Sequence, residues 1–255
     1  MLEIIILLSA GIGAGIITGL VSASAVTVMA PLLVVMLGYP PYMAIGIALA
    51  VDVFSSAAAT IIYKRYKRVR VKPSLILLFF ALAATIAGSY VSVDIPPLVL
   101  SLASGAGIVL AGFFIYKKEN GKSAIFPHEV TFFKKHRNLS LVLIGLWVGT
   151  IAGIFGAGGG IMILTGLTLI LDYDTHEAIG TSVFLMIFIA LLGGAVHYVN
   201  WPFPGQALLW GSIGGVAGSF ASSRIVNNFR EVNLNKILGV IILTLGLLLI
   251  LKPFL

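Results

Sequence analysis

The sequence predicts an all-α, polytopic membrane protein made of two homologous repeats. Of its 255 residues, 59% are hydrophobic and 10% are charged, whereas soluble domains carry about 25% charged residues. Apolar stretches recur that approach or exceed the roughly 20 residues needed to cross a bilayer. The second half also repeats the residue pattern of the first. In each repeat we expect a broken or re-entrant first helix followed by three spans.

Eight apolar stretches are candidate spans, and the first stretch of each half is too long for one simple crossing. These stretches are residues 4–37, 42–63, 75–93, 98–116, 139–171, 178–199, 207–221 and 237–251. The longest polar stretch joins the halves. We therefore predict a first transmembrane repeat over residues 1–116, a basic linker over 117–138 and a second repeat over 139–255.

The duplication appears when the chain is shifted by the spacing that separates Gly11 from Gly145. At this spacing of 134 residues the matching positions are Gly15 with Gly149, Gly19 with Gly153, Ala44-Ile45-Gly46 with Ala178-Ile179-Gly180, Gly105 with Gly239, and Gly112 with Gly246. Ala87-Gly88-Ser89 matches Ala217-Gly218-Ser219 at a spacing of 130, so one loop is shorter in the second half. Duplicated halves are typical of secondary transporters.

A glycine cluster interrupts the first stretch of the second half. Five glycines stand within residues 153–160, and each costs about 1 kcal/mol of helix propensity relative to alanine. We therefore expect a helix break there, flanked by two half-helices. If the half-helices return to one side of the membrane, or cross it twice, the repeats are inverted. If they form one broken span, the repeats are parallel.

The distribution of basic residues favours inverted repeats. Six of the 16 Lys and Arg residues lie in the loop at 64–72, and six more lie within 117–137. Short basic loops beside membrane spans are typically cytoplasmic, and they need no nucleic-acid partner to explain them. With both segments in the cytoplasm, the inverted arrangement also places Arg224 and Arg230 inside, whereas the parallel arrangement leaves them outside.

The predicted breaks are candidate anion sites. A helix that begins beyond a break offers free N–H groups and the positive end of its dipole, and glycine lets the backbone approach a ligand. The first half has hydroxyl residues in place of the glycines, and a Thr/Ser pair follows the second break. The predicted substrate-binding residues are Ser22, Ser24, Thr27, Gly156, Gly158, Gly159, Gly160, Thr181 and Ser182. The alternative is close helix packing by small residues, without a ligand.

Two ionisable residues are candidates for ion coupling. Asp52 lies near the middle of a predicted span, where ionisable groups are costly and usually functional. The alternative is a structural hydrogen bond to a neighbouring helix. His197 can carry a proton near neutral pH, although its neighbours Tyr198 and Trp201 are also typical of an aromatic belt at the membrane interface.

Enzyme and metal signatures are missing from the sequence. The absence of cysteine excludes disulfides, zinc–cysteine sites and thiol catalysis. We find no HExxH, G-x-S-x-G or P-loop motif, and no βαβ pattern surrounds the glycine runs. The acidic loop with Asp172, Asp174, His176 and Glu177 is better interpreted as solvated than as a metal site, because it lacks tight ligand spacing. We expect no enzyme activity, cofactor or metal.

The order and spacing of these motifs resemble the TauE/SafE family, described as sulfite exporters or toluene-sulfonate uptake permeases. The resemblance rests on Gly-x-x-x-Gly-x-x-Gly-Ala-Gly-Gly-Gly at residues 149–160, on Ala178-Ile179-Gly180-Thr181-Ser182, and on His197. It covers nearly the whole chain. The motif positions that it carries over are Gly156, Gly158, Gly159, Gly160, Thr181 and Ser182, whereas residues 22–26 of the first half depart from the glycine-rich pattern.

The resemblance implies transport of a small sulfur-containing anion across a prokaryotic plasma membrane. We expect a secondary transporter that exports sulfite, sulfoacetate or another sulfonate by alternating access, and the alternative is a passive anion channel. The expected partners are this anion and membrane lipid, without nucleic acid. A homodimer is compatible with the sequence.

Overall fold

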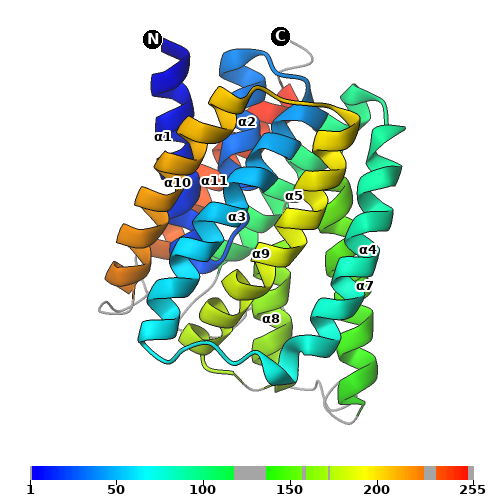
Figure 1. Ribbon diagram of the computed structural model, residues 1–255, viewed down its shortest axis with the longest axis vertical. Helices are drawn as coiled ribbons and strands as arrows, with labels where there is room; N and C mark the ends of the chain where they lie inside the picture. The colour runs from blue at the N-terminus through cyan, green and yellow to red at the C-terminus, as the bar shows by residue number, and fades with distance from the viewer. Residues whose placement is uncertain (1, 118–135, 157–158, 172, 227–233, 252–255) are drawn as a thin grey trace.

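The structure, a computed structural model, describes residues 2–117, 136–156, 159–171, 173–226 and 234–251. Within these ranges the chain is helical apart from short connections, and it contains no strand (Figure 1). The all-α prediction is therefore confirmed.

Each half contains a broken first helix and three further helices. The first half comprises α1 (Leu2–Val21), α2 (Val26–Leu37), α3 (Pro41–Arg65), the 3₁₀ turn η1 (Lys72–Ser74), α4 (Leu75–Val93) and α5 (Pro97–Lys117). The second half comprises α7 (Arg137–Phe155), α8 (Gly159–Leu171), α9 (Thr175–Asn200), α10 (Gly205–Val226) and α11 (Leu234–Leu251). Most helix ends in the second half fall close to the positions that the duplication predicts from the first. The ends of α1 and α7, for example, are separated by the same 134 residues as Gly11 and Gly145.

Five helical segments in the described part of the chain are long and apolar enough to cross a membrane. They are Leu2–Val21, Pro41–Arg65, Lys72–Ser92, Arg137–Phe155 and Thr175–Asn200. The segments on either side of the predicted breaks differ in length, because α2 and α8 have only 12 and 13 residues. At 1.5 Å per residue such helices reach about 20 Å, which is too short to cross the roughly 30 Å hydrocarbon core.

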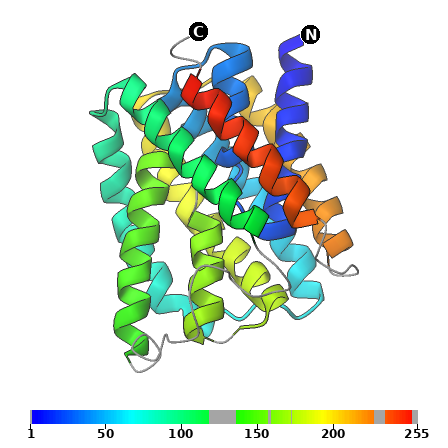
Figure 2. The same cartoon turned by 180° about the vertical axis from the view of Figure 1, so that it is seen from behind.

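Helices of one half pack mainly against helices of the other half. The first α-helix of each half packs along the fourth α-helix of the other, so that α1 lies against α10 and α7 lies against α4. The central helices α3 and α9 pack together, as do α5 and α11. Figures 1 and 2 show this arrangement from opposite sides, with α5 and α11 crossing the front of the second view.

The two broken segments enter the molecule from opposite ends. In Figure 1, α1 runs down from the end where both termini are marked, and α2 returns toward that end. The helix α7 instead starts at the lower end, and α8 returns there. The residues of the first reversal, 22–25, are buried, and so are Gly156 and Gly159, which flank the second. Irregular backbone is tolerated at such depth when protein surrounds it.

Glycines allow the helix pairs α1–α10 and α7–α4 to approach closely. On α1, a Cβ at Gly11 or Gly15 would overlap the carbonyl oxygen of Gly211 or Gly215 on α10. On α7, Gly149 faces the carbonyl oxygen of Ala81 on α4 in the same way. The repeated glycines that reveal the duplication therefore serve helix packing, which small residues permit in membranes.

Replacing Gly15 with alanine should destabilise the protein by about 2 kcal/mol, since overpacking of a tight contact typically costs about 1–3 kcal/mol. The added Cβ would overlap the Gly215 oxygen and lie 2.7 Å from the Ser219 amide nitrogen. Gly13→Ala on the same helix is the matched control, because its nearest neighbour is the Val28 Cγ1 atom at 3.4 Å. Thermal unfolding in detergent measures the difference. Equal midpoints for the two variants would contradict this packing role.

Candidate functional site

The first helix break begins at a residue with left-handed backbone. Helix α1 ends at Val21, and Ser22 has a φ of 56°, a conformation that costs a residue with a Cβ about 1–2 kcal/mol. The hydroxyl of Thr18 lies 3.0 Å from the carbonyl oxygen of Ala23, and Thr27 donates to the carbonyl oxygen of Ser24 at 2.7 Å. The Ser24 carbonyl also accepts from the Thr27 backbone amide at 3.0 Å, so that backbone and side-chain bonds together hold the start of α2.

The second break begins at the equivalent position. Helix α7 ends at Phe155, and Gly156 has a φ of 67°, so the left-handed residues of the two breaks occupy matching places in the repeats. The Gly156 amide donates to the carbonyl oxygen of Ala152 at 2.9 Å, as is common where a helix ends in a left-handed residue. The predicted site residue Gly158 lies outside the described residues.

The two breaks meet at the centre of the molecule. The backbone of Gly160, in the first turn of α8, lies so close to Ser22 that a Cβ would overlap the Ser22 carbonyl oxygen. The Ser22 hydroxyl is hydrogen-bonded to the hydroxyl of Ser182 on α9. The Ser24 hydroxyl lies 3.0 Å from the carbonyl oxygen of Gly156. We call these five residues the break junction, and the serine side chains in it are buried.

Asp52 lies beside the junction and is fully buried. One of its carboxyl oxygens, Oδ2, lies 2.8 Å from the Ser24 hydroxyl. The other, Oδ1, accepts from Ser56 at 3.1 Å and lies 3.5 Å from the Thr18 hydroxyl. The backbone amide of Ala25, just before α2, is a further hydrogen-bonding partner. The carboxyl group therefore lies at the amino-terminal end of α2, where the first N–H groups of the helix have no partner within it.

The second half has no acidic residue at the matching place. Met186 on α9 lies 134 positions after Asp52, and its sulfur is 3.4 Å from where a Cβ of Gly159 would stand. An uncharged thioether thus faces the first residue of α8. The two helix starts consequently differ, because α2 already has a carboxyl group beside it and α8 has an apolar side chain.

The predicted site residues Thr27 and Thr181 are not part of the break junction, and each makes another hydrogen bond. Thr27 is bonded within its own turn, as described above. The hydroxyl of Thr181 accepts a hydrogen bond from the Arg70 backbone amide at 3.0 Å, in the loop between α3 and η1. Its neighbour Ser182 is thus the member of the Thr/Ser pair that reaches the junction.

His197 is buried near the opposite end of α9, with 1% of its surface exposed. Its Nδ1 lies 3.0 Å from the carbonyl oxygen of Gly193, and its ring stacks on Tyr42 with 4.2 Å between centroids. The adjacent Tyr198 and Trp201 are exposed, as expected for an aromatic belt. Because a carbonyl only accepts hydrogen bonds, Nδ1 carries a proton. Among the described residues, Nε2 has no hydrogen-bond partner.

Ion pairs join the halves at the basic end of the molecule. Arg68 pairs with Asp174, and Arg70 pairs with Glu177, each at 3.1 Å. The hydrogen bond that Arg70 donates to Glu177 raises the pKa of Arg70 above its ordinary value, and the guanidinium also lies over the Tyr173 ring at 5.0 Å. Exposed pairs of this kind contribute little to stability because water screens the charges. In the part of the chain that the structure describes, no three His, Asp or Glu residues gather into a metal-binding group.

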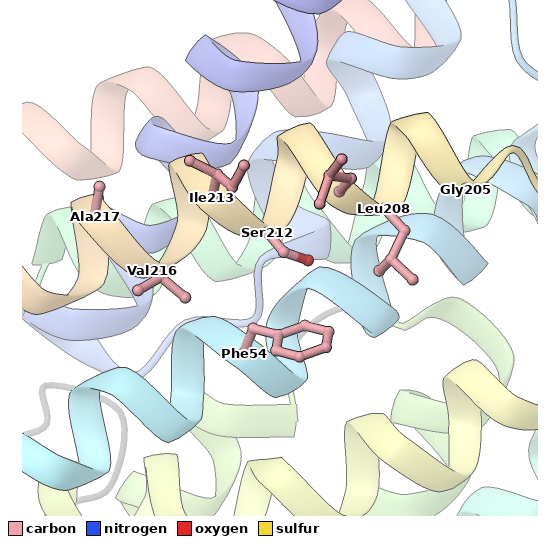
Figure 3. A pocket seen from close by; sticks show the side chains of 8 residues that line it. Phe54, Gly205, Leu208, Ser212, Ile213, Val216 and Ala217 are labelled. Atoms are coloured by element: carbon pink, nitrogen blue, oxygen red, sulfur yellow. The ribbon is translucent and has the colours of Figure 1, made fainter.

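Two apolar grooves lie on the outer side of α3, away from the junction. One, of about 570 Å³, is bordered by Phe54 and by α10 residues that include Leu208 and Ile213, as Figure 3 shows. The other, of about 390 Å³, shares Phe54 and Leu208 and extends to α9. Neither groove is lined by a charged residue, so neither offers an anion an electrostatic partner.

The fold and the buried break junction define a multi-pass membrane protein with a polar centre shared by two halves. The sequence profile of the family described as "Sulfite exporter TauE/SafE" matches residues 7–249. The chain therefore belongs to this family, as its motifs predicted, and it is a membrane transporter.

Curated relatives agree with this assignment. The "Probable membrane transporter protein YdhB" of Bacillus subtilis (strain 168) is 26% identical over 243 residues, which cover 92% of this chain and 96% of the relative. The "Probable membrane transporter protein YunE" of the same organism is 25% identical over 63% of this chain and 64% of its own length. A "Probable membrane transporter protein" of Xylella fastidiosa (strain Temecula1 / ATCC 700964) is 24% identical over 96% of this chain and 94% of its own. No solved structure matches the chain significantly.

Proposed function

We propose that the protein exports a small sulfur-containing anion, such as sulfite, sulfoacetate or another sulfonate, by alternating access. The observation that carries this proposal is the contact between two helix breaks, one from each half, in a buried polar centre. Transporters of duplicated design bind their cargo near the membrane midplane, at the interface of the repeats. The description of the matched family supports a sulfur-containing cargo.

We propose that the amino terminus of α8 and the junction serines hold the anion. The amides at Gly159 and Gly160 belong to the first turn of α8, where the helix lacks internal partners for its N–H groups. Ser22, Ser24 and Ser182 add hydroxyl donors from the other elements of the junction. Since these side chains are buried, the halves must move apart for the anion to enter and leave.

We also propose that the two repeats are inverted, with the basic loop at 64–72 and the linker at 117–138 in the cytoplasm. The opposite entry of α1 and α7 in Figure 1 supports inversion, and so does the exchange of packing partners between the halves. The orientation follows from the excess of Lys and Arg in these two segments.

Flux measurements test the proposed cargo. Proteoliposomes loaded with labelled sulfoacetate or sulfite should release the label in a saturable manner that protein-free vesicles lack. If correctly inserted protein moves neither anion nor another sulfonate, the proposed function is wrong. Flux that does not saturate and never drives accumulation would instead indicate a passive channel.

Single cysteines test the proposed orientation, because the natural chain has none. The exposed residue Lys67 lies in the loop between α3 and α4, and the exposed residue Asp94 lies at the far end of α4. Lys67→Cys and Asp94→Cys therefore form a matched pair. In intact cells, a maleimide that cannot cross the membrane should label Asp94→Cys and spare Lys67→Cys until the cells are opened. The reverse pattern would overturn the assignment of the basic loop to the cytoplasm.

A further inference from the structure

We propose that Asp52 is the proton-binding group of this transporter, that it is protonated in this conformation, and that Ser24 links its proton to the contact between the two breaks. This inference rests on the proposed function and adds the coupling ion and its mechanism.

The Ser24 hydroxyl has two acceptors within hydrogen-bond distance but only one proton to donate. Its oxygen lies 2.8 Å from Asp52 Oδ2 and 3.0 Å from the carbonyl oxygen of Gly156. A hydroxyl has one proton to donate, and a carbonyl oxygen has none. The Ser24 proton is therefore needed for the bond to Gly156. The shorter contact to Asp52 is then a hydrogen bond only when the carboxyl group supplies the proton.

Deprotonation breaks this chain of donors. Once Asp52 has lost its proton, the Ser24 hydroxyl donates to the carboxylate, because hydrogen bonds to charged acceptors are stronger than those to neutral ones. The Gly156 carbonyl then loses its donor from the first half. The Asp52 O–H bond breaks and its proton leaves, the hydrogen bond between Asp52 and Ser24 reverses its direction, and the hydrogen bond that joins the two breaks is lost. Protonation of Asp52 therefore favours the closed junction.

The charges around Asp52 determine whether the anion binds together with the proton or in exchange for it. Charged or titratable side chains on the described parts of the helices packed against α3 are Glu3 on α1, His176, Glu177, His197 and Tyr198 on α9, Arg224 on α10, and Tyr116 on α5. None is a hydrogen-bond or ion-pair partner of Asp52 among the described residues. With no base beside it, the carboxyl must be neutral when an anion binds nearby, because like charges disfavour ionisation. Proton and anion therefore bind together.

A row of hydroxyl groups connects Asp52 with the basic end. Ser56 and Thr60 follow Asp52 at intervals of four residues on α3, and Lys64 continues the row at the exposed helix end. Residues spaced by four share one face of a helix. Ser56 already donates to Asp52, and the buried hydroxyl of Thr60 has no partner among the described residues. In the other direction the row continues with Ala48 and Ala44, which offer no polar group. The proton therefore exchanges with the basic end.

The test is the proton uptake that accompanies anion binding. Sulfoacetate suits this test because it stays ionised at neutral pH. When it is added to purified protein in weak buffer at an alkaline pH, where Asp52 starts ionised, a pH indicator should report uptake approaching one proton per bound anion. Asp52→Asn keeps a donor for Ser24 and should bind sulfoacetate without proton uptake. Uptake that persists in Asp52→Asn, or binding to the natural protein without uptake, would overturn the inference. If the natural protein binds no sulfonate, the proposed function itself fails.

Flux experiments keep the test decisive if Asp52→Asn does not fold. In natural-sequence proteoliposomes, acidifying the side that the basic end faces should speed sulfonate efflux from that side about tenfold per pH unit where proton binding limits the rate, since each unit changes the proton concentration tenfold. Ser56→Ala should slow the response to a pH jump at the basic end. Ser55→Ala is its matched control, because Ser55 donates to its own helix at Val51. Efflux that ignores pH, or equal responses of the two serine variants, would contradict the proposal.

Discussion

Gly160→Ala should strongly reduce transport while leaving the rest of the fold assembled. The added Cβ would overlap the Ser22 carbonyl oxygen and lie 3.0 Å from the Ser22 carbonyl carbon. Both atoms are backbone, so a side-chain rotation cannot relieve the overlap. The two breaks must separate, and the contacts of Ser22 and Ser24 across the junction are then lost. Overpacking typically costs about 1–3 kcal/mol, and we expect flux to fall at least about tenfold.

The matched control lies on the same short helix. A Cβ at Gly166 would meet the Ile144 side chain at 3.2 and 3.3 Å, and that side chain can move aside. Gly166→Ala should therefore retain most of the transport activity. Sulfoacetate efflux and thermal unfolding of both variants check this prediction. If Gly160→Ala transports as well as Gly166→Ala, the close contact between the breaks is irrelevant to transport.

Met186→Asp should prevent anion binding by placing a carboxylate where the first half has Asp52. The Met186 sulfur adjoins Gly159 at the start of α8, so a carboxylate there would occupy the proposed anion site. Two like charges 4 Å apart repel by about 4 kcal/mol at an effective dielectric constant of 20. We therefore expect the apparent affinity for sulfoacetate to fall at least about 100-fold at neutral pH.

Two variants at the same position separate charge from shape. Met186→Leu keeps an apolar side chain of similar volume, and Met186→Asn adds polarity without charge. Both should bind the anion better than Met186→Asp, and acidic pH should partly restore Met186→Asp by neutralising the new carboxyl group. If Met186→Asp and Met186→Asn bind sulfoacetate equally well at neutral pH, the anion does not bind at the start of α8.

The helix breaks were predictable because their cause is local. The glycines near Gly156 disfavour a continuous helix whatever surrounds them, and the alignment of the repeats then points to Ser22. The structure places left-handed backbone at both positions. Family motifs within the same stretches predicted the transporter family, which the sequence comparison confirmed.

The contacts across the junction were not predictable, because they join residues far apart in the chain. The bond between Ser24 and Gly156 depends on how the halves exchange helices, and periodicity within one helix carries no information about that. The same applies to Gly15, whose partner Gly215 lies on α10. Thr181 was predicted as a site residue from its motif position. Its hydroxyl instead accepts a hydrogen bond from the Arg70 backbone amide, away from the junction.

Two supporting residues of the candidate site were also missed by the sequence reasoning. Thr18 and Ser56 both contact the Asp52 carboxyl. The spacing of Ser56 from Asp52 offers a signal, because residues four apart lie on one helix face. Thr18 gives no such signal, because its approach to Asp52 depends on the packing of α1 against α3.

The most direct test of the central claim is to locate a bound anion. Crystals of the protein with a bromine-labelled sulfonate, such as bromoethanesulfonate, would reveal the bromine by its anomalous scattering. The sulfonate should lie at the break junction, against the start of α8 and within reach of Ser24 or Ser182. A transported sulfonate found instead in the apolar groove beside Phe54, with the junction closed and empty, would contradict the account.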